Sequence, residues 1–219
     1  MHYFRNCINT LILLLLCNSA IQAATTYNVN GFTFTEYTNK NEWLADTTGK
    51  LYLEDFNDNT LIPELSISSV YGSINTYNNF WLDHLYGNHE TETSFYFTRA
   101  ANAFGGDWTV DTRYPAGVGS NGLGILIFID LVSGDTVKLY KEIPDDLIGF
   151  YGIALPEDIL FNSIRLGEGT QGPSHGYETY YLDNLVFNTP QPVPLPTALW
   201  LFGSGLLGLV SFSKRKKAA

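Results

Sequence analysis

Helical spacing of apolar residues is nearly absent between Thr25 and Asn188, and this absence constrains the fold of the chain most strongly. The segment instead holds short apolar or alternating runs separated by Gly, Asn, Asp and Pro, a pattern typical of strands and turns. Ile125–Ile129 is continuously apolar, as expected for a strand covered on both sides. The runs predict ten strands: Gly31–Tyr37, Leu51–Phe56, Ile67–Val70, Ser94–Arg99, Trp108–Asp111, Gly124–Leu131, Thr136–Lys141, Phe150–Ala154, Ser163–Leu166 and Tyr180–Phe187.

One helix is predicted over Asn39–Thr47, with Thr38 or Asn39 as its N-cap and Glu42 in its first turn. Ten short strands around a single helix favour an all-β fold. We expect a β-sandwich of the jelly-roll kind over residues 24–189.

The charge of this body excludes one class of partner. Residues 24–190 contain seven of the 12 Lys and Arg residues and all 22 Asp and Glu residues, so their net charge is 7 − 22 = −15. Nucleic-acid binding relies on a basic surface, and it is therefore not expected. Both cysteines, Cys7 and Cys17, precede the body, so thiol chemistry is not expected in it.

The first 23 residues have the layout of a signal peptide. Arg5 precedes the apolar run Leu11–Leu16, and small and polar residues follow as far as Ala23. We expect signal peptidase to cleave after Ala23. A lipoprotein signal, in which Cys17 would carry the lipid, is disfavoured because the bulky Leu16 precedes that cysteine.

The other end of the chain is predicted to enter a membrane. Prolines at alternate positions make residues 190–196 an extended linker, because they remove backbone donors. Residues 197–213 carry no charge and are long enough for a short transmembrane helix. A basic cluster follows this span and is expected to hold its end on the cytoplasmic side. The predicted helix and basic tail together cover residues 197–219, and the cluster consists of Lys214, Arg215, Lys216 and Lys217.

This tail resembles the PEP-CTERM sorting signals of Gram-negative bacteria. The motif residues are Val193, Pro194, Leu195 and Pro196, and they match the V-P-L-P variant; the apolar span and the basic end follow in the family's order. The resemblance implies processing by an exosortase and a role in exopolysaccharide or biofilm matrix. It also implies a precursor anchored in the inner membrane, with the body on the extracytoplasmic side before it reaches the cell envelope, surface or matrix.

The body resembles an uncharacterised group of exported β-sandwich domains found upstream of such tails. The matching segments occur in the same order: Leu53–Phe56, Asn102–Trp108, Phe150–Ile153 and Glu178–Phe187. The resemblance implies the fold and export, but it implies no activity.

Catalytic signatures are sparse. No G-x-S-x-G motif occurs, and the nearest similar segment is Val118–Gly122. We therefore expect a non-enzymatic protein. The alternative is a secreted hydrolase of matrix polysaccharide, whose paired carboxylates would have to be chosen among 22 acidic residues.

Calcium is the one cofactor that the sequence suggests. Asp55, Asn57 and Asn59 match the start of a calcium-binding loop, but the later loop positions do not match. Strand alternation puts Asp183 on one face with Leu185 and Phe187, so an inward face would bury its carboxylate. If the first and last strands are neighbours, Asp55 and Asp183 meet. Two interpretations stay open: a structural calcium ion, or carboxylates that accept backbone or arginine hydrogen bonds.

Aromatic residues in polar surroundings suggest glycan binding. Trp81 and Tyr86, with Tyr77 and Phe80 nearby, have rings suited to the apolar faces of sugars. For Trp81 a place in the core is an equally good interpretation. The expected role is that of an exported structural or glycan-binding protein whose partner is an exopolysaccharide.

Overall fold

The computed structural model describes residues 24–86, 91–111, 124–139, 141–144, 147–169 and 177–190. Within them lie helix α2 (Lys40–Asp46) and the following strands: β1 (Thr25–Val29), β2 (Phe32–Tyr37), β3 (Lys50–Glu54), β4 (Leu65–Ser68), β5 (Ser73–Asn75), β6 (Phe80–Tyr86), β7 (Thr93–Ala101), β8 (Ala103–Asp111), β9 (Ile125–Leu131), β10 (Thr136–Lys138), β11 (Ile148–Ala154), β12 (Phe161–Glu168) and β13 (Tyr177–Thr189).

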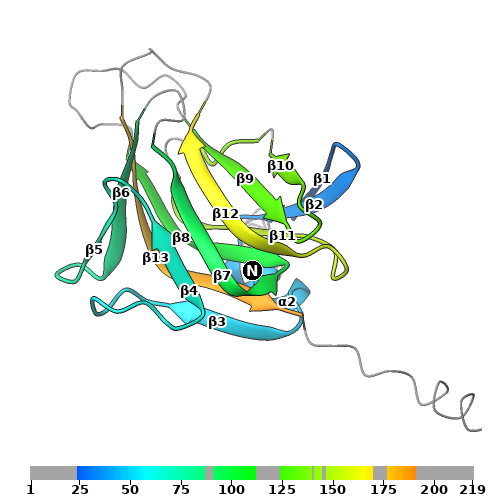
Figure 1. Ribbon diagram of the computed structural model, residues 1–219, viewed down its shortest axis with the longest axis horizontal. Helices are drawn as coiled ribbons and strands as arrows, with labels where there is room; N and C mark the ends of the chain where they lie inside the picture. The colour runs from blue at the N-terminus through cyan, green and yellow to red at the C-terminus, as the bar shows by residue number, and fades with distance from the viewer. Residues whose placement is uncertain are drawn as a thin grey trace, which may run out of the picture.

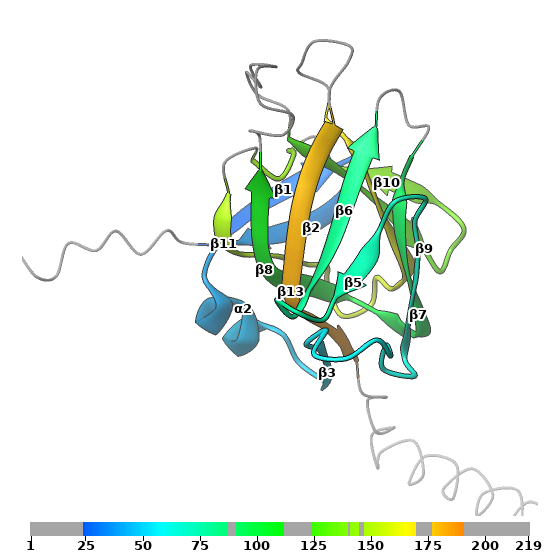
Figure 2. The ribbon, with the colours of Figure 1, turned by 90° about the vertical axis from the view of Figure 1, so that its left-hand side faces the viewer.

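The strands form two antiparallel sheets that pack as a sandwich (Figures 1 and 2). The larger sheet has eight strands in the order β1-β2-β11-β8-β13-β6-β5, with β3 paired to the second half of β13. The smaller sheet has the order β10-β9-β12-β7-β4. The predicted all-β sandwich is confirmed.

Each of the ten predicted strands overlaps an observed strand, and α2 forms with Asn39 as its N-cap. The Asn39 side chain accepts hydrogen bonds from the backbone N–H groups of Asn41 and Glu42, two donors that a helix leaves free at its start. Three strands were not predicted, namely β1, β5 and β6.

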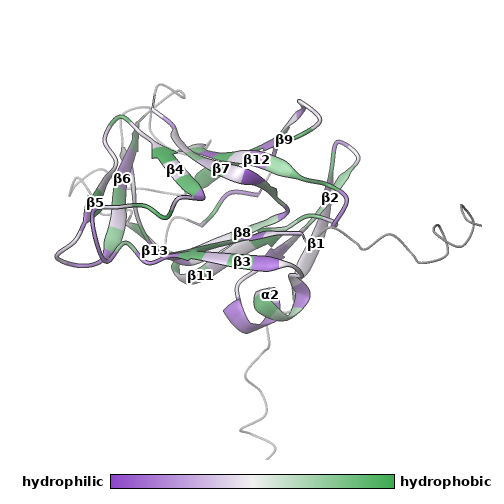
Figure 3. Cartoon of the chain, turned by 60° about the horizontal axis from the view of Figure 1, so that its bottom comes forward, coloured by the Kyte–Doolittle hydropathy of each residue, from purple (hydrophilic) through white to green (hydrophobic). Residues whose placement is uncertain are grey.

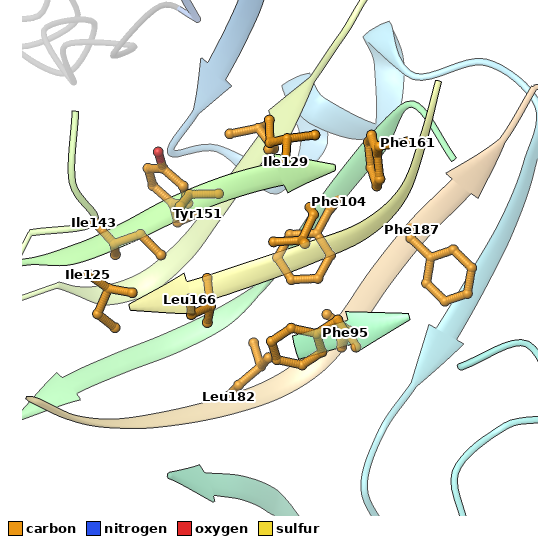
Figure 4. Packing of buried hydrophobic residues seen from close by; sticks show 14 of the residues in the cluster. Phe95, Phe104, Ile125, Ile129, Ile143, Tyr151, Phe161, Leu166, Leu182 and Phe187 are labelled. Atoms are coloured by element: carbon orange, nitrogen blue, oxygen red, sulfur yellow. The ribbon is translucent and has the colours of Figure 1, made fainter. Parts of the chain in front are cut away.

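Aromatic and aliphatic side chains together fill the space between the two sheets (Figure 4). The ring of Phe97 on β7 lies 4.6 Å, centroid to centroid, from that of Phe187 on β13, and Phe95 lies 5.5 Å from Phe104. Each fully buried side chain of this size contributes about 1.5–3 kcal/mol. These contacts join the smaller sheet to the larger one.

A second apolar cluster lies outside the larger sheet, where α2 covers it (Figure 3). Trp43 of α2 is fully buried against Phe150, and its Nε1 donates to the backbone oxygen of Ile153 at 3.1 Å. A Cβ at Gly152 would lie 2.8 Å from Cδ1 of Trp43, so the indole needs a glycine beneath it. This packing fixes α2 over β11 and β2.

Strand β13 contains an irregularity that changes which side chains face inward. Its pairing with β8 shifts register between Asp183 and Val186, and Asn184 has a positive φ of 47°. Leu182 and Leu185 both enter the core, so the alternation is reset between them. The predicted shared face of Asp183, Leu185 and Phe187 is therefore wrong: Asp183 lies on the outer face of the larger sheet, paired with Asp107.

Among the residues described, no helix is long and apolar enough to cross a membrane. The predicted signal peptide (1–23), Pro-rich linker from residue 191 onward and transmembrane helix (197–219) lie outside the described residues.

Candidate functional site on the outer face of the smaller sheet

A continuous row of side chains crosses all five strands of the smaller sheet. The strand registers pair its members in turn, from β10 to β4: Thr136, Asp130, Ser163, Tyr96 and Ser66. Their sequence neighbours Ile129, Phe95 and Phe97 enter the core, so the row belongs to the outer face. We call this row, together with Arg165 and Glu92, the Tyr96 face.

Tyr96 is the exposed aromatic residue of this face. Its side chain is 46% exposed, and its partners across the sheet are two serines, Ser163 and Ser66. Small neighbours on both adjacent strands leave the phenol ring without a bulky partner across the sheet. A strand that is paired along both edges therefore presents one aromatic surface to solvent.

Arg165 on β12 organises the charged half of the face. Its guanidinium donates two hydrogen bonds to Asp130, from Nε at 3.0 Å and from Nη2 at 3.2 Å, and Nη1 donates to Glu92 at 2.8 Å. Asp130 also accepts hydrogen bonds from the hydroxyls of Ser163 (2.9 Å) and Thr136 (2.7 Å). Such bidentate pairs fix the planes of both groups.

The protonation states of this network follow from these contacts. Burial acts to raise the pKa of Asp130, but hydrogen bonds from Arg165 and the two hydroxyls outweigh it, and the pKa lies below its usual value. The hydrogen bond to Asp130 raises the pKa of Arg165. Both groups are therefore charged at neutral pH.

Phe128 borders the face beside Arg165. The guanidinium carbon lies 5.2 Å from the ring centroid of Phe128, and Nζ of Lys138 lies 5.8 Å from it. Both distances are those of cation–π contacts. Phe128 thus supports the orientation of Arg165.

The face combines an exposed ring, hydroxyls, carboxylates and a guanidinium on one surface. This set can stack against an apolar ring face and exchange hydrogen bonds with hydroxyl groups. The sequence analysis did not identify this face, although one signal was available. In the predicted strand, Ser94, Tyr96 and Thr98 share one side and Phe95 and Phe97 share the other, so Tyr96 is a single tyrosine on the polar side.

The structure places the predicted glycan-binding aromatics elsewhere. Trp81 is 6% exposed and belongs to the core, so it has no free ring face to offer a sugar. Phe80 packs edge-on against Tyr181 at 4.9 Å, and Tyr77, in the turn between β5 and β6, is 92% exposed. The side chain of Tyr86 lies outside the described residues.

The predicted calcium ligands come together only in part. Strands β3 and β13 are neighbours, and the charge of Asp55 contributes to raising the pKa of Asp183, after burial and the charge of Asp107. The backbone N–H of Asn184 donates to Asp183 at 2.6 Å. Lys40 of α2 forms a 3.2 Å ion pair with Asp107.

The remaining predicted ligands lie in the exposed loop after β3. The backbone N–H of Asn57 donates to Asp55 at 3.2 Å, and Asn59 is exposed further along the loop. Across the described ranges, no group of three or more His, Cys, Asp or Glu residues is arranged to hold a metal ion. The calcium site stays a prediction.

The buried carboxylate in this region is Glu54, which the sequence did not single out. Tyr52, Glu54 and Phe56 face inward, whereas Leu51 and Leu53, at 42% and 52% exposed, face outward with Asp55. Glu54 accepts hydrogen bonds from the backbone N–H groups of Phe56 and Ile62, both at 2.8 Å. It anchors the loop rather than binding a ligand.

Comparison with known protein families identifies the tail. Residues 192–216 match the PEP-CTERM protein-sorting motif, which includes Val193–Pro196 and the basic residues as far as Lys216. The predicted resemblance is confirmed. The motif indicates an exported protein, sorted by an exosortase, that reaches the cell surface or the extracellular space.

Comparison with curated proteins found no match. Among solved structures, a family 29 carbohydrate binding module is 13% identical with a TM-score of 0.45, over 66% of this chain and 91% of that one. A variant of such a module complexed with mannohexaose is 13% identical with a TM-score of 0.46, over 66% and 94% of the two chains. A variant complexed with cellulohexaose is 14% identical with a TM-score of 0.45, over 64% and 92%. Similarity at this level is too weak to carry a functional inference.

Proposed function

We propose that this exported protein is a non-enzymatic glycan-binding β-sandwich. It holds a polysaccharide of the cell envelope, cell surface or extracellular matrix, in an exopolysaccharide or biofilm setting, against the Tyr96 face. The observation that carries the proposal is the exposed ring of Tyr96, on a strand paired along both edges, beside the ordered Arg165–Asp130 pair.

The chemistry of the face suits a sugar chain. A pyranose ring has an apolar face that stacks on a phenol ring, and hydroxyls at its rim that exchange hydrogen bonds with charged groups. Because neighbouring strands lie about 4.8 Å apart, the row runs for roughly 19 Å across five strands. Such a surface accommodates more than one ring of a linear polysaccharide.

The protonation state of Asp130 favours binding over hydrolysis at this carboxylate. Cleavage of a glycosidic bond needs a carboxylic acid that stays protonated through a raised pKa. Asp130 has a lowered pKa instead, because its hydrogen bonds to Arg165 and two hydroxyls outweigh the effect of burial. A carboxylate held in this state accepts hydrogen bonds from a ligand but does not protonate a leaving group.

The proposed route to the matrix follows the two ends of the chain. Signal peptidase removes residues 1–23, and residues 197–219 hold the precursor in the inner membrane with the sandwich outside the cytoplasm. The exosortase then processes the tail near Val193–Pro196, and the protein reaches its polysaccharide.

The test is affinity electrophoresis of the purified protein through gels containing neutral or acidic soluble polysaccharides. Tyr96→Ala should weaken binding roughly thirtyfold, because truncating a central aromatic contact typically costs about 2 kcal/mol. Tyr77→Ala is the matched control, since Tyr77 is an exposed tyrosine in the turn between β5 and β6, which belong to the other sheet. It should bind like the wild type.

Two outcomes contradict the proposal. If Tyr96→Ala is retarded in the gel as strongly as the wild type and Tyr77→Ala loses binding, the binding site lies at the turn between β5 and β6 instead. Release of reducing ends from the retained polysaccharide would establish the hydrolase instead.

A further inference from the structure

A polar pocket of about 230 Å³ lies on the outer side of the larger sheet, away from the Tyr96 face. Thr33, Thr35 and Tyr37, at alternate positions of β2, form one wall. Phe34 between them enters the core, so these three side chains share the outer face. The end of α2 and the loop after β11 form the other walls.

Two carboxylates give the pocket its charge. Asp46 at the end of α2 accepts a hydrogen bond from the Tyr37 hydroxyl at 3.2 Å, and Glu157 accepts one from the Thr48 hydroxyl. Burial, together with the charge of Asp46, raises the pKa of Tyr37 to about 12, so its phenol stays protonated. None of the described residues that line the pocket is basic. The pocket therefore attracts hydrogen-bond donors and repels anions.

Asn102 is a buried polar residue of the pocket lining whose amide has a fixed orientation. Its side chain lines the pocket and is 4% exposed. Its Nδ2 donates to the backbone oxygen of Leu155 at 3.2 Å, which fixes the orientation of the amide, and Oδ1 has no hydrogen-bond partner among the described residues. This oxygen has almost no accessible surface, so the amide shapes the wall of the pocket and is not itself a contact for a ligand.

The size and walls of the pocket define the class of ligand. A volume of about 230 Å³ exceeds what one ion or one water needs, since a water occupies about 30 Å³ in the liquid. An apolar wall next to the acceptors is formed by Ala154, Leu155 and Pro156. A small ring with C–H groups on its faces and hydroxyl donors at its rim fits this combination.

We propose that the pocket binds one neutral sugar unit at the end of a glycan chain. The sugar hydroxyls donate to Asp46 and Glu157, and the two carboxylates exclude uronate units. This site is separate from the Tyr96 face, and its occupation does not depend on the function proposed for that face.

The test is a saturation-transfer NMR titration of the full-length protein with methyl glycosides of glucose, galactose, mannose and glucuronate. At least one neutral glycoside should bind, and the glucuronide should not. Asp46→Asn and Glu157→Gln should each weaken neutral binding roughly tenfold, because each replaces a charged acceptor by a neutral amide. Asp158→Asn, which alters the exposed acid next to Glu157 outside the pocket lining, is the matched control and should change nothing.

A second variant fills the pocket without removing a polar group. Ala154→Leu should abolish glycoside binding while leaving polysaccharide binding by the Tyr96 face intact, and Tyr96→Ala should do the reverse. Absence of binding by all neutral glycosides, or equal binding by wild type and Ala154→Leu, overturns the proposal. Binding of the glucuronide as tightly as of the neutral sugars also overturns it.

Discussion

Asp183 shows how one residue's conformation decides the environment of its neighbour. Asn184 adopts a positive φ, the strand alternation is reset, and Asp183 faces Asp107 on the outer side of the larger sheet. Like charges directly opposite each other on adjacent strands are unfavourable. Lys40 and the side-chain amide of Asn184, which donates to Asp107 at 3.0 Å, offset part of that repulsion.

Asp183→Asn should therefore stabilise the protein at neutral pH. Burial, the charge of Asp107 and the charge of Asp55 raise the pKa of Asp183, so its ionisation disfavours the folded state. This penalty is absent below the ordinary pKa of about 3.9 and develops as the pH rises through the raised folded value. Urea unfolding should show a gain in stability at pH 7 that disappears near pH 3.

Calcium provides the second arm of this experiment. If the predicted ion binds at Asp55 and Asp183, calcium should raise the melting temperature of the wild type above that in chelator, and Asp183→Asn should lose this difference. Equal wild-type melting temperatures in calcium and in chelator would remove the ion. Asp135→Asn, in the exposed turn between β9 and β10, serves as the control for a general loss of charge.

At the scale of elements, strands with a clear apolar alternation were predictable, and strand β6, whose inward row includes a carboxylate, was not. Strand β6 was missed because Asp83 occupies an inward position between Trp81 and Leu85, where it is fully buried and accepts a hydrogen bond from Thr93. Strand β7 was predicted because Phe95 and Phe97 alternate with polar residues.

The candidate sites were less predictable than the strands. The Tyr96 face depends on the order in which five strands pair, and the pocket is lined by residues as far apart in sequence as Thr33 and Glu157. Neither association is local in sequence. The meeting of Asp55 and Asp183 was expected only on the condition that their strands are neighbours. Strands β3 and β13 do pair, and the charge of Asp55 contributes to raising the pKa of Asp183.

Helix α2 depends on its single buried residue. Trp43→Phe should lower the free energy of unfolding by about 1–3 kcal/mol, because it removes ring volume and the hydrogen bond to the backbone oxygen of Ile153. The measurement is urea unfolding followed by circular dichroism. Leu44→Ala, at a 38% exposed position of the same helix, should change stability much less. Equal losses in the two variants would contradict the role assigned to the indole.

The whole molecule consists of an acidic sandwich and a sorting tail. The tail is identified by the match over residues 192–216, and the sandwich carries two candidate glycan sites on opposite outer surfaces. A protein with two such sites can bind a chain along its length at one and a chain end at the other. This arrangement suits cross-linking in a matrix.

Deleting Val193–Ala219 should abolish membrane retention of the precursor, because the deletion removes the sorting motif together with the apolar span and its basic stop. Fractionation of cells that lack exosortase activity, followed by immunoblotting, measures this retention. A variant with the exposed Lys50 and Arg99 changed to Gln removes basic charge elsewhere and should remain in the membrane fraction. Normal retention of the truncated chain would contradict the anchoring role.

The position of β13 determines how the sandwich carries mechanical load. This strand ends at Thr189, just before the tail, and it is hydrogen-bonded to β8 on one side and to β6 and then β3 on the other. A pull on the tail therefore acts along a strand held at both edges and loads many hydrogen bonds in shear at once. An edge strand would instead unzip one bond at a time. A matrix protein tethered at this end would resist force through its most strongly held strand.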